Sequence, residues 1–222
     1  MIFSMKYKCI IFDNDGVLVD SEAISNGVML EMARSMGLDI DYDFAMGHFS
    51  GVSLKSTMDY IEQEAGTPLP ADFEEEFRRR TFEAFKKDLK PVKGIPALLE
   101  KIQVPYCVAS SGPVKKLRLS LKATNLLDKF ENRIFSSYTI GSWKPNPDIF
   151  LYAAREMGFD PGDCAVVEDS AAGVKAARAG GFDVYGFATE KNWKTLENLG
   201  ATVFFDMQEL LPLLNGKGSD RR

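Results

Sequence analysis

Short apolar runs recur along the chain, and amphipathic stretches separate most of them. The runs are "CIIF", "PYCVAS", "RIFSS", "CAVVE", "DVYGFA" and "TVFF", which begin at residues 9, 105, 133, 164, 183 and 202. Because these runs are almost continuously hydrophobic, they predict strands that are buried on both faces of a sheet. Strands that alternate with helices predict an α/β fold, with a Rossmann-like parallel sheet covered by helices on both faces.

The amphipathic stretches between these runs predict helices. Three of them are "PVKKLRLSLKA" at 113–123, "PDIFLYAAREMG" at 147–158 and "SAAGVKAARAGG" at 170–181. The second ends at Gly158 and the third at Gly180 and Gly181, as expected because glycine commonly follows the last turn of a helix.

Residues 21–90 interrupt this alternation and predict helices alone. The last of these helices carries an apolar stripe, which is typical of a helix that packs through one face. The stripe consists of Phe73, Phe77, Phe85 and Leu89. Pro91 and Gly94 then punctuate the return of the chain. We therefore expect a core domain of residues 1–20 and 91–215, an inserted helical cap domain of residues 21–90, and a flexible tail of residues 216–222.

The composition excludes several classes of function. Hydrophobic residues make up 45% of the 222 residues and charged residues 27%, which is ordinary for a globular protein. The formal net charge of -5 argues against broad binding to a nucleic-acid backbone. No apolar stretch approaches the roughly 18 residues of a membrane span, and the first residues do not resemble a secretory signal. We expect a cytoplasmic protein, a monomer or a weak dimer, that binds neither nucleic acid nor membrane.

The cysteines indicate neither a disulfide framework nor a zinc site. Cys9, Cys107 and Cys164 are odd in number and form no C-x-x-C pair. Each lies within or just before a short apolar run. We expect small buried thiols in a reducing compartment.

Polar residues follow three of the predicted strands directly. They are Asp13 and Asp15 after the first strand, Ser110 and Ser111 after "PYCVA", and Glu168 and Asp169 after "CAVV". Because ligands bind at the carboxyl ends of strands in an open parallel sheet, these residues are expected to meet in one crevice.

Four carboxylates in one crevice would repel each other unless a cation lies among them. Oxygen ligands without histidine or cysteine suit a hard cation, and Mg²⁺ is the best candidate. The hydroxyls and backbone amides of "SSG", just before a predicted helix, provide a seat for an anion. Lys144, in the loop "SWKPNPD", adds a positive charge. The combination predicts a site that handles a phosphoryl group.

Taken singly, these residues have ordinary explanations. A lone D-x-D pair is often no more than two loop carboxylates, Ser110 could cap a helix, and Lys144 could lie on the surface. A calcium loop is excluded, because the fifth, sixth and twelfth positions from Asp13 are Val17, Leu18 and Ile24. The joint placement of the polar residues at strand ends is what favours a site.

At this point the sequence resembles the haloacid dehalogenase superfamily of phosphohydrolases. The four motifs of that family match "IIFDNDGVLVDSE", Ser110 in "CVASSGP", Lys144 in "WKPNPDIF", and "VVEDSAAG", in the expected order. The helical insertion resembles the cap of the β-phosphoglucomutase and phosphoglycolate phosphatase branch. Within that branch, "CVASSGP" and "SWKPNPDIF" are most similar to the 6-phosphogluconate phosphatase-like members.

The resemblance implies a role for each matching position. Asp13 would be the nucleophile that forms an aspartyl-phosphate, and Asp15 would act as general acid and then general base. Mg²⁺ would be held by Asp13, by Asp15 through its backbone carbonyl, and by Asp169; for Glu168, direct metal binding and binding through water both remain open. The phosphoryl oxygens would be held by Ser110, Ser111 and Lys144.

These roles predict a Mg²⁺-dependent phosphatase for a small phosphorylated metabolite, such as a sugar phosphate or a sugar-acid phosphate like 6-phosphogluconate. A β-phosphoglucomutase-type mutase is the first alternative, but such enzymes resemble this chain with a histidine where Ser25 stands and an arginine where Leu54 stands. A non-enzymatic phosphoacceptor module is a remote alternative, since such modules are about half this length. A dehalogenase would need neither the second acid nor the metal site. His48 and the arginines Arg78 to Arg80 remain without an assigned role, and one of the arginines could meet a substrate carboxylate.

Overall fold

The computed structural model describes residues 5–50 and 52–216, and the chain divides into two compact units. Met1–Val19 and Pro91–Arg222 form one unit, here the core unit, and Asp20–Lys90 form the other, here the helical unit. The flexible tail expected at 216–222 lies, apart from Gly216, outside the described residues.

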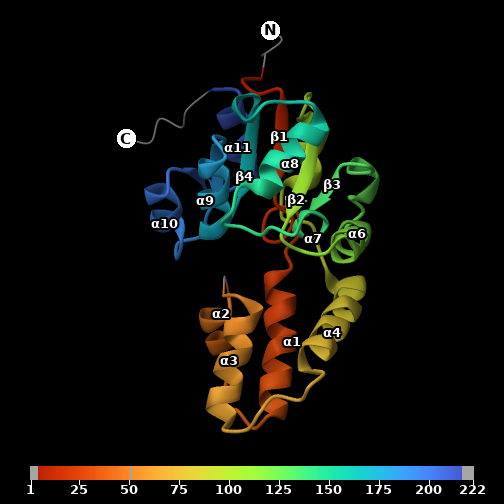
Figure 1. Cartoon of the computed structure of the whole chain (residues 1–222), viewed down its shortest axis with the longest axis vertical. Helices are drawn as coiled ribbons and strands as arrows, with labels where there is room; N and C mark the ends of the chain where they lie inside the picture. Colours follow the sequence, from red (N-terminus) through yellow and green to blue (C-terminus); the bar gives the residue numbers. More distant parts are fainter. Residues whose placement is uncertain (1–4, 51, 217–222) are drawn as a thin grey trace. The chain divides into compact units, whose positions relative to one another are not determined.

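The core unit contains a six-stranded parallel sheet (Figure 1). Its strands are β1 (Cys9–Phe12), β2 (Tyr106–Ser110), β3 (Ile134–Ser136), β4 (Cys164–Glu168), β5 (Asp183–Phe187) and β6 (Thr202–Phe204). Each of the six apolar runs forms one of these strands, so the expected α/β fold with a parallel sheet is confirmed. Ile10, Ile11 and Phe12 are all fully buried, which shows that β1 is covered on both faces.

The strand order β3-β2-β1-β4-β5-β6 creates a switch point between β1 and β4. From β1 the chain builds outward through β2 to β3, and it then returns to place β4 on the other side of β1. The register pairs Phe12 with Val167, so Asp13 and Glu168 follow neighbouring strands at the same level. The backbone N–H of Asp13 also donates to the carbonyl of Val167 at 2.9 Å. In open α/β sheets, ligands bind at such a switch point.

Helices flank the sheet of the core unit (Figure 1). They are α5 (Ile95–Lys101), α6 (Val114–Ala123), α7 (Ser137–Ile140), α8 (Asp148–Met157), α9 (Ala171–Ala179), α10 (Trp193–Asn198) and α11 (Met207–Leu214). In α8, Ile149, Phe150 and Ala153 lie on one stripe and are fully buried. Gly158 ends α8 with a φ of 81°, a left-handed conformation that glycine adopts without steric cost.

The three cysteines are free and buried, as expected. Cys9 and Cys164 are direct neighbours on β1 and β4, and Cys107 lies on β2 opposite Ile11. All three contribute to the hydrophobic cluster that α8 and α9 cover.

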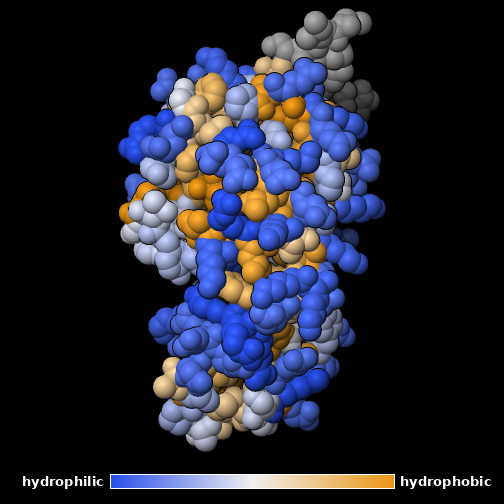
Figure 2. All heavy atoms as spheres, turned by 90° about the vertical axis from the view of Figure 1, so that its right-hand side faces the viewer, coloured by the Kyte–Doolittle hydropathy of each residue, from blue (hydrophilic) through white to orange (hydrophobic). Residues whose placement is uncertain are grey.

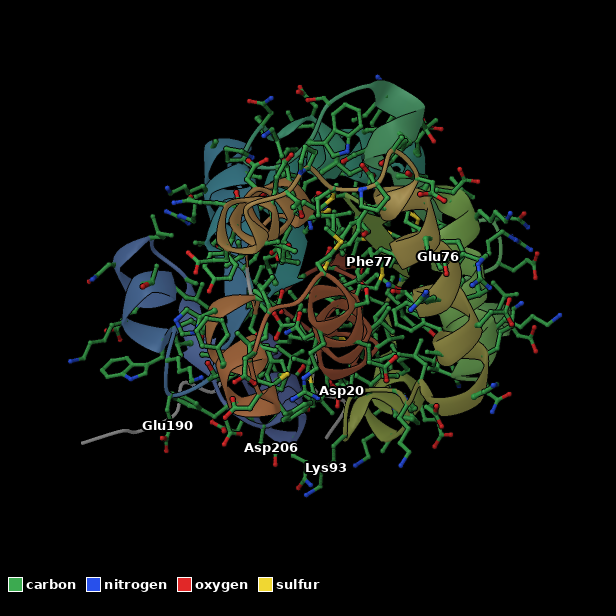
Figure 3. All side chains as sticks on the ribbon, turned by 90° about the horizontal axis from the view of Figure 1, so that it is seen from below. Asp20, Glu76, Phe77, Lys93, Glu190 and Asp206 are labelled. Carbon is green, nitrogen blue, oxygen red and sulfur yellow. The ribbon has the colours of Figure 1, made fainter. Side chains whose placement is uncertain are left out.

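The helical unit consists of α1 (Glu22–Ser35), α2 (Tyr42–His48), α3 (Leu54–Ala65) and α4 (Phe73–Asp88). Phe73 and Phe85 of the predicted stripe are buried. Phe73 belongs to the hydrophobic cluster of this unit, and Phe77 packs partly buried against that cluster. Figure 3 shows Phe77 on the side of α4 that faces the other helices of this unit, and Glu76 on the opposite side. On the face that bears α4, hydrophilic side chains cover most of the helical unit (Figure 2).

Helix α2 places His48 in its last turn. Asp41 caps the start of this helix, where its side chain accepts the N–H of Phe44. The ring of His48 stacks on Phe44 with centroids 3.8 Å apart. Ser53 then caps α3.

None of the helices in the described part of the chain is long and apolar enough to cross a membrane.

Candidate active site

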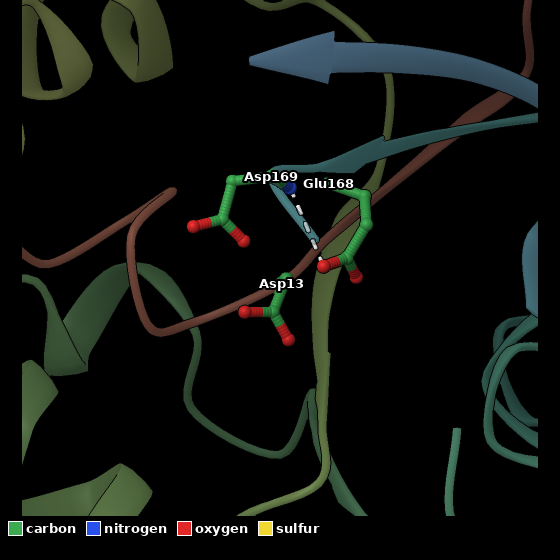
Figure 4. Close-up of side chains that lie close together, drawn as sticks. All are labelled: Asp13, Glu168 and Asp169. Carbon is green, nitrogen blue, oxygen red and sulfur yellow. Dashed lines mark hydrogen bonds between the residues drawn. The ribbon is translucent and has the colours of Figure 1, made fainter. Parts of the chain in front are cut away.

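Three carboxylates converge at the switch point of the sheet. Asp13 follows β1, and Glu168 and Asp169 lie at the end of β4 (Figure 4). Each contributes an oxygen atom, and these oxygens lie within 4.8 Å of one another. Asp13 is 6% exposed and Glu168 is 1% exposed, so two of the three charges are buried. Such a group is unfavourable without compensating positive charge.

Two glycines leave the space that these carboxylates occupy. A Cβ atom at Gly16 would lie 1.9 Å from Oδ2 of Asp169, and one at Gly173 would lie 2.0 Å from Cδ of Glu168. Gly16 also has a φ of +78°, which L-residues rarely adopt. The glycine of D-x-D-G is therefore required both for its backbone conformation and for the close approach of Asp169.

Lys144 bridges two of the buried carboxylates. Its Nζ lies 2.6 Å from Oδ1 of Asp13 and 2.7 Å from Oε2 of Glu168, and its side chain is 6% exposed. The ammonium of this lysine also lies over the ring of Phe150, whose centroid is 4.8 Å from Nζ. The surface explanation for Lys144 is therefore wrong.

The protonation states of this pair follow from burial and charge. Burial raises the pKa of Asp13 to about 7; Lys144 opposes the rise, whereas Glu168 and Asp15 add to it. Burial alone would lower the pKa of Lys144, but the charges of Asp13 and Glu168 outweigh this effect and hold it above the ordinary value. Lys144 is thus a permanent cation beside Asp13. A metal ion next to Asp13 would favour its carboxylate form further.

Glu168 is held from both ends of its carboxylate. Oε2 accepts a hydrogen bond from the ammonium of Lys144. Oε1 accepts a hydrogen bond from the N–H of Asp169 at 3.3 Å, and two more from the N–H and the hydroxyl of Ser170. The hydroxyl of Ser170 also caps α9 by accepting the N–H of Gly173 at 3.0 Å. Ser170 therefore both caps α9 and holds Glu168 in place. Glu168 in turn fixes the position of Lys144.

Ser110 and Ser111 lie at the carboxyl end of β2, on the strand next to β1. Ser110 is buried, and its Oγ accepts the N–H of Gly112 at 3.1 Å. Helix α6 has Pro113 as its N-cap with no side-chain cap, so Ser110 does not cap it. Ser111 is half-buried in the turn. Both residues lie at the strand edge that carries the carboxylates.

Asp15 pairs with a residue that the sequence did not single out. Nζ of Lys116 lies 2.8 Å from Oδ2 of Asp15, and their side chains are 22% and 31% exposed. Lys116 belongs to the first turn of α6, directly after "SSGP". The available signal was the presence of two lysines, Lys115 and Lys116, in a helix start that contains no acidic residue. Cations there oppose the helix dipole.

The donor set and the charges fit a divalent cation. In their ionised forms, Asp13, Asp15, Glu168 and Asp169 carry four negative charges, of which Lys116 and Lys144 offset half. A single Mg²⁺ would balance the remainder, and hard carboxylate oxygens are the ligands that it prefers. The cluster of Asp13, Glu168 and Asp169 could therefore hold a metal ion.

The arginines of α4 take part in ion pairs along their own helix. Arg78 pairs with Glu74 at 2.6 Å, and both Arg79 and Arg80 pair with Glu76 at 2.7 and 2.6 Å. All three arginine side chains are exposed. The acidic and basic residues in the first half of α4 therefore pair with one another on a solvated face of the helix.

Comparisons with known proteins place these features in a family. A model described as haloacid dehalogenase-like hydrolase matches residues 7–181. The chain is 32% identical over 216 residues to 6-phosphogluconate phosphatase of Escherichia coli (strain K12), covering 97% of this chain and 98% of that protein. It is 30% identical over 193 residues to β-phosphoglucomutase of Bacillus subtilis (strain 168), covering 81% and 82%.

A solved structure agrees with these sequence matches. The crystal structure of a conserved haloacid dehalogenase-like protein from Agrobacterium tumefaciens str. C58 is 32% identical and superposes with a TM-score of 0.85, covering 95% of this chain and 98% of that one. The resemblance inferred from the four motifs is thus confirmed. The chain belongs to the haloacid dehalogenase-like hydrolases.

Proposed function

We propose that this hydrolase is a Mg²⁺-dependent phosphatase that cleaves a small phosphorylated metabolite through an aspartyl-phosphate. The observation that carries the proposal is the buried Asp13, whose Oδ1 is held 2.6 Å from Nζ of Lys144 at the switch point of the sheet. A buried carboxylate held in one orientation beside a fixed cation is suited to attack an electrophile that carries negative charge.

The first step transfers the phosphoryl group to Asp13. A carboxylate oxygen of Asp13 forms a bond to phosphorus while the bond from phosphorus to the substrate oxygen breaks. The departing oxygen takes the proton of the Asp15 carboxyl group, so an alcohol leaves and Asp15 becomes a carboxylate. Lys144, together with Ser110 and Ser111, would hold the phosphoryl oxygens.

The second step hydrolyses the aspartyl-phosphate. A water molecule gives its proton to the Asp15 carboxylate and its oxygen to phosphorus, and the bond between phosphorus and Asp13 breaks. Phosphate leaves, and both aspartates return to their starting states. Asp13 and Asp169, with the backbone carbonyl of Asp15, would hold Mg²⁺. The ion supplies Lewis-acid stabilisation of phosphoryl charge when bound.

The relatives support a substrate class. One relative that matches almost the full length of this chain is a 6-phosphogluconate phosphatase, and another relative is a β-phosphoglucomutase. We infer a sugar phosphate or sugar-acid phosphate as substrate, with the helical unit as a cap that contributes specificity. We propose that the protein acts in the cytoplasm as a monomer or a weak dimer.

The similarity to a β-phosphoglucomutase makes a mutase reaction the second candidate function. A mutase must hold the second phosphate of a bisphosphate intermediate. Ser25 and Leu54 stand where mutases of this type carry histidine and arginine, so two groups that suit this task are absent. We therefore favour hydrolysis. Conversion of glucose 1-phosphate into glucose 6-phosphate without release of phosphate would contradict this choice.

The test is a phosphate-release screen with Mg²⁺ over sugar phosphates, sugar-acid phosphates, phosphoglycolate and nucleotides. We expect turnover of at least one sugar or sugar-acid phosphate, loss of activity with a chelator, and recovery when Mg²⁺ is restored. Asp13→Asn keeps the shape of the side chain but removes the nucleophile, so it should lower kcat by at least about a thousandfold. Retained activity in Asp13→Asn would refute the mechanism.

A further inference from the structure

Lys116 is a cation in contact with the proposed proton carrier, Asp15, and the four motifs give it no role. We propose that Lys116 is a positioning residue, which holds the carboxyl group of Asp15 in the orientation needed for both proton transfers. The proposal rests on the proposed function, because it assigns Asp15 its role. It extends that function to a residue outside the four motifs.

The contact joins two elements of the core unit that are distant in sequence. Asp15 lies in the turn after β1, and Lys116 lies on α6, 101 positions later. Nζ of Lys116 is 2.8 Å from Oδ2 of Asp15, a length typical of a charge-assisted hydrogen bond. At this length the ammonium restricts rotation of the carboxylate about its terminal bond.

The stem of Lys116 is placed by the turn that carries the proposed phosphate seat. A Cβ atom at Gly112 would lie 3.5 Å from Cδ of Lys116 and 3.6 Å from Oγ of Ser110. Gly112 therefore lies close to both the lysine stem and the serine hydroxyl. Lys116 thus contacts the turn that carries the proposed phosphate seat as well as the proposed acid, Asp15.

The pair differs from the ion pairs on the surface. Lys116 and Asp15 are 22% and 31% exposed, whereas Lys55 and Asp59 of α3 are 83% and 58% exposed. Lys116 also occupies the first turn of α6, where a positive charge is unfavourable for the helix. A partly buried cation in an unfavourable position, paired with the proposed proton carrier, fits a functional constraint better than a stabilising surface pair.

Positioning matters because Asp15 must act twice. Its carboxyl group faces the leaving oxygen in the first step and the attacking water in the second. An unrestrained aspartate would spend part of its time in other rotamers. Lys116 itself exchanges no proton with the substrate. Its removal should therefore slow the steps that need a proton from Asp15 and spare a step that does not.

Two substrates distinguish a step that needs a proton from Asp15 from a step that does not, and both can be used with the full-length enzyme. The alkyl oxygen of 6-phosphogluconate needs a proton as it leaves, whereas p-nitrophenolate is a good leaving group without one. For both substrates, kcat/KM reports the steps up to transfer of the phosphoryl group to Asp13. The variants are Lys116→Met, Lys116→Arg as the conservative rescue, and Lys115→Met as the matched control on the same helix turn. Lys115 is exposed.

We expect Lys116→Met to lower kcat/KM for 6-phosphogluconate by about 10- to 100-fold, a part of the 10²- to 10⁴-fold that general acid–base catalysis contributes. The value for p-nitrophenyl phosphate should change by less than about threefold, while its steady-state kcat falls because water activation still needs Asp15. Lys116→Arg should recover most of the loss, and Lys115→Met should match the wild type.

Equal losses of kcat/KM on both substrates, or no loss on either, would overturn the positioning role. Thermal unfolding of each variant identifies a loss caused by misfolding, and the arginine variant then decides the question. A wild-type enzyme that releases phosphate from none of the screened sugar and sugar-acid phosphates, or an active Asp13→Asn variant, would instead overturn the proposed function and the role of Lys116 with it.

Discussion

At the scale of single residues, the site combines groups whose positions are set by their neighbours. One carboxylate oxygen of Glu168 accepts a hydrogen bond from Lys144, and the other accepts hydrogen bonds from Ser170 at the start of α9. The sequence identified Glu168 as part of a motif but left its role open, because a residue pattern does not give the direction of a side chain. Its burial and its partners became evident only in three dimensions.

Gly173→Ala tests how tightly Glu168 is enclosed. An added Cβ would lie 2.0 Å from Cδ of Glu168, so the carboxylate would have to move away from Lys144. We expect about 1–3 kcal/mol of destabilisation from overpacking, and a fall in kcat that is larger than the change in KM. Urea unfolding and steady-state kinetics measure both effects. Wild-type kinetics and stability in this variant would show that Glu168 can be displaced without consequence.

Asp183 offers a test of stability against pH outside the site. Hydrogen bonds from Lys6 and Tyr7 lower the pKa of Asp183 below its ordinary value. A carboxyl group with a lowered pKa in the folded state stabilises the fold above its unfolded pKa, and the contribution disappears as the pH falls through the folded value.

Asp183→Asn should therefore reduce the free energy of unfolding at pH 7 by about 0.5–1.5 kcal/mol, a modest value because the carboxylate is half-exposed. The difference from the wild type should shrink as the pH falls below about 4. Urea unfolding at a series of pH values measures it. Asp59→Asn removes the exposed pair with Lys55 and serves as control, with an expected change below about 0.5 kcal/mol. A difference for Asp183→Asn that grows towards acid pH would contradict the expectation.

At the scale of elements, hydrophobic continuity predicted every strand, because buried parallel strands leave a strong signal in the sequence. The pattern predicted helices across residues 21–90 but did not mark α2 as a separate helix, because Tyr42–His48 is short and its start depends on one side-chain cap from Asp41. The hydrophobic pattern could not predict the order of the strands in the sheet, because apolar runs carry no information about which strand lies next to which. That order is what brings Asp13 beside Glu168.

Gly27 is the opposite case to Gly173, although both glycines lie in helices. It lies in the interior of α1, and a Cβ atom there would meet no heavy atom of the described residues within 4 Å beyond the backbone of its own helix and its chain neighbours. Glycine in a helix interior costs about 0.5–1 kcal/mol relative to alanine. We expect Gly27→Ala to raise the free energy of unfolding by about this amount. A lower midpoint in urea than that of the wild type would mean that Gly27 serves a purpose other than helix formation.

At the scale of the whole molecule, two units are built from one interrupted chain. Val19 pairs with Pro91 across an antiparallel bridge, and the N–H of Val92 donates to the carbonyl of Leu18 at 3.0 Å. These contacts lie within the core unit, where the chain leaves it and returns. The sequence predicted the interruption because Asp20–Lys90 lacks strand-like runs. It could not reveal Lys116, whose partner Asp15 lies on a different element.

The paired ends of the insertion suggest that the core unit folds by itself. The N–H of Asp20 lies 3.0 Å from the carbonyl of Lys90, so a two-residue Asn-Gly turn in place of residues 21–89 can close the gap as a hairpin. We expect this variant to keep the far-UV circular dichroism of an α/β protein and to unfold cooperatively.

The same variant tests whether the helical unit selects the substrate. If it does, kcat/KM for 6-phosphogluconate should fall much further than kcat/KM for p-nitrophenyl phosphate, because the smaller ester depends less on contacts beyond the phosphoryl group. An unchanged ratio would assign selectivity to the core unit. A variant that aggregates, while full-length Asp13→Asn remains folded, would show that the core unit requires the insertion for stability.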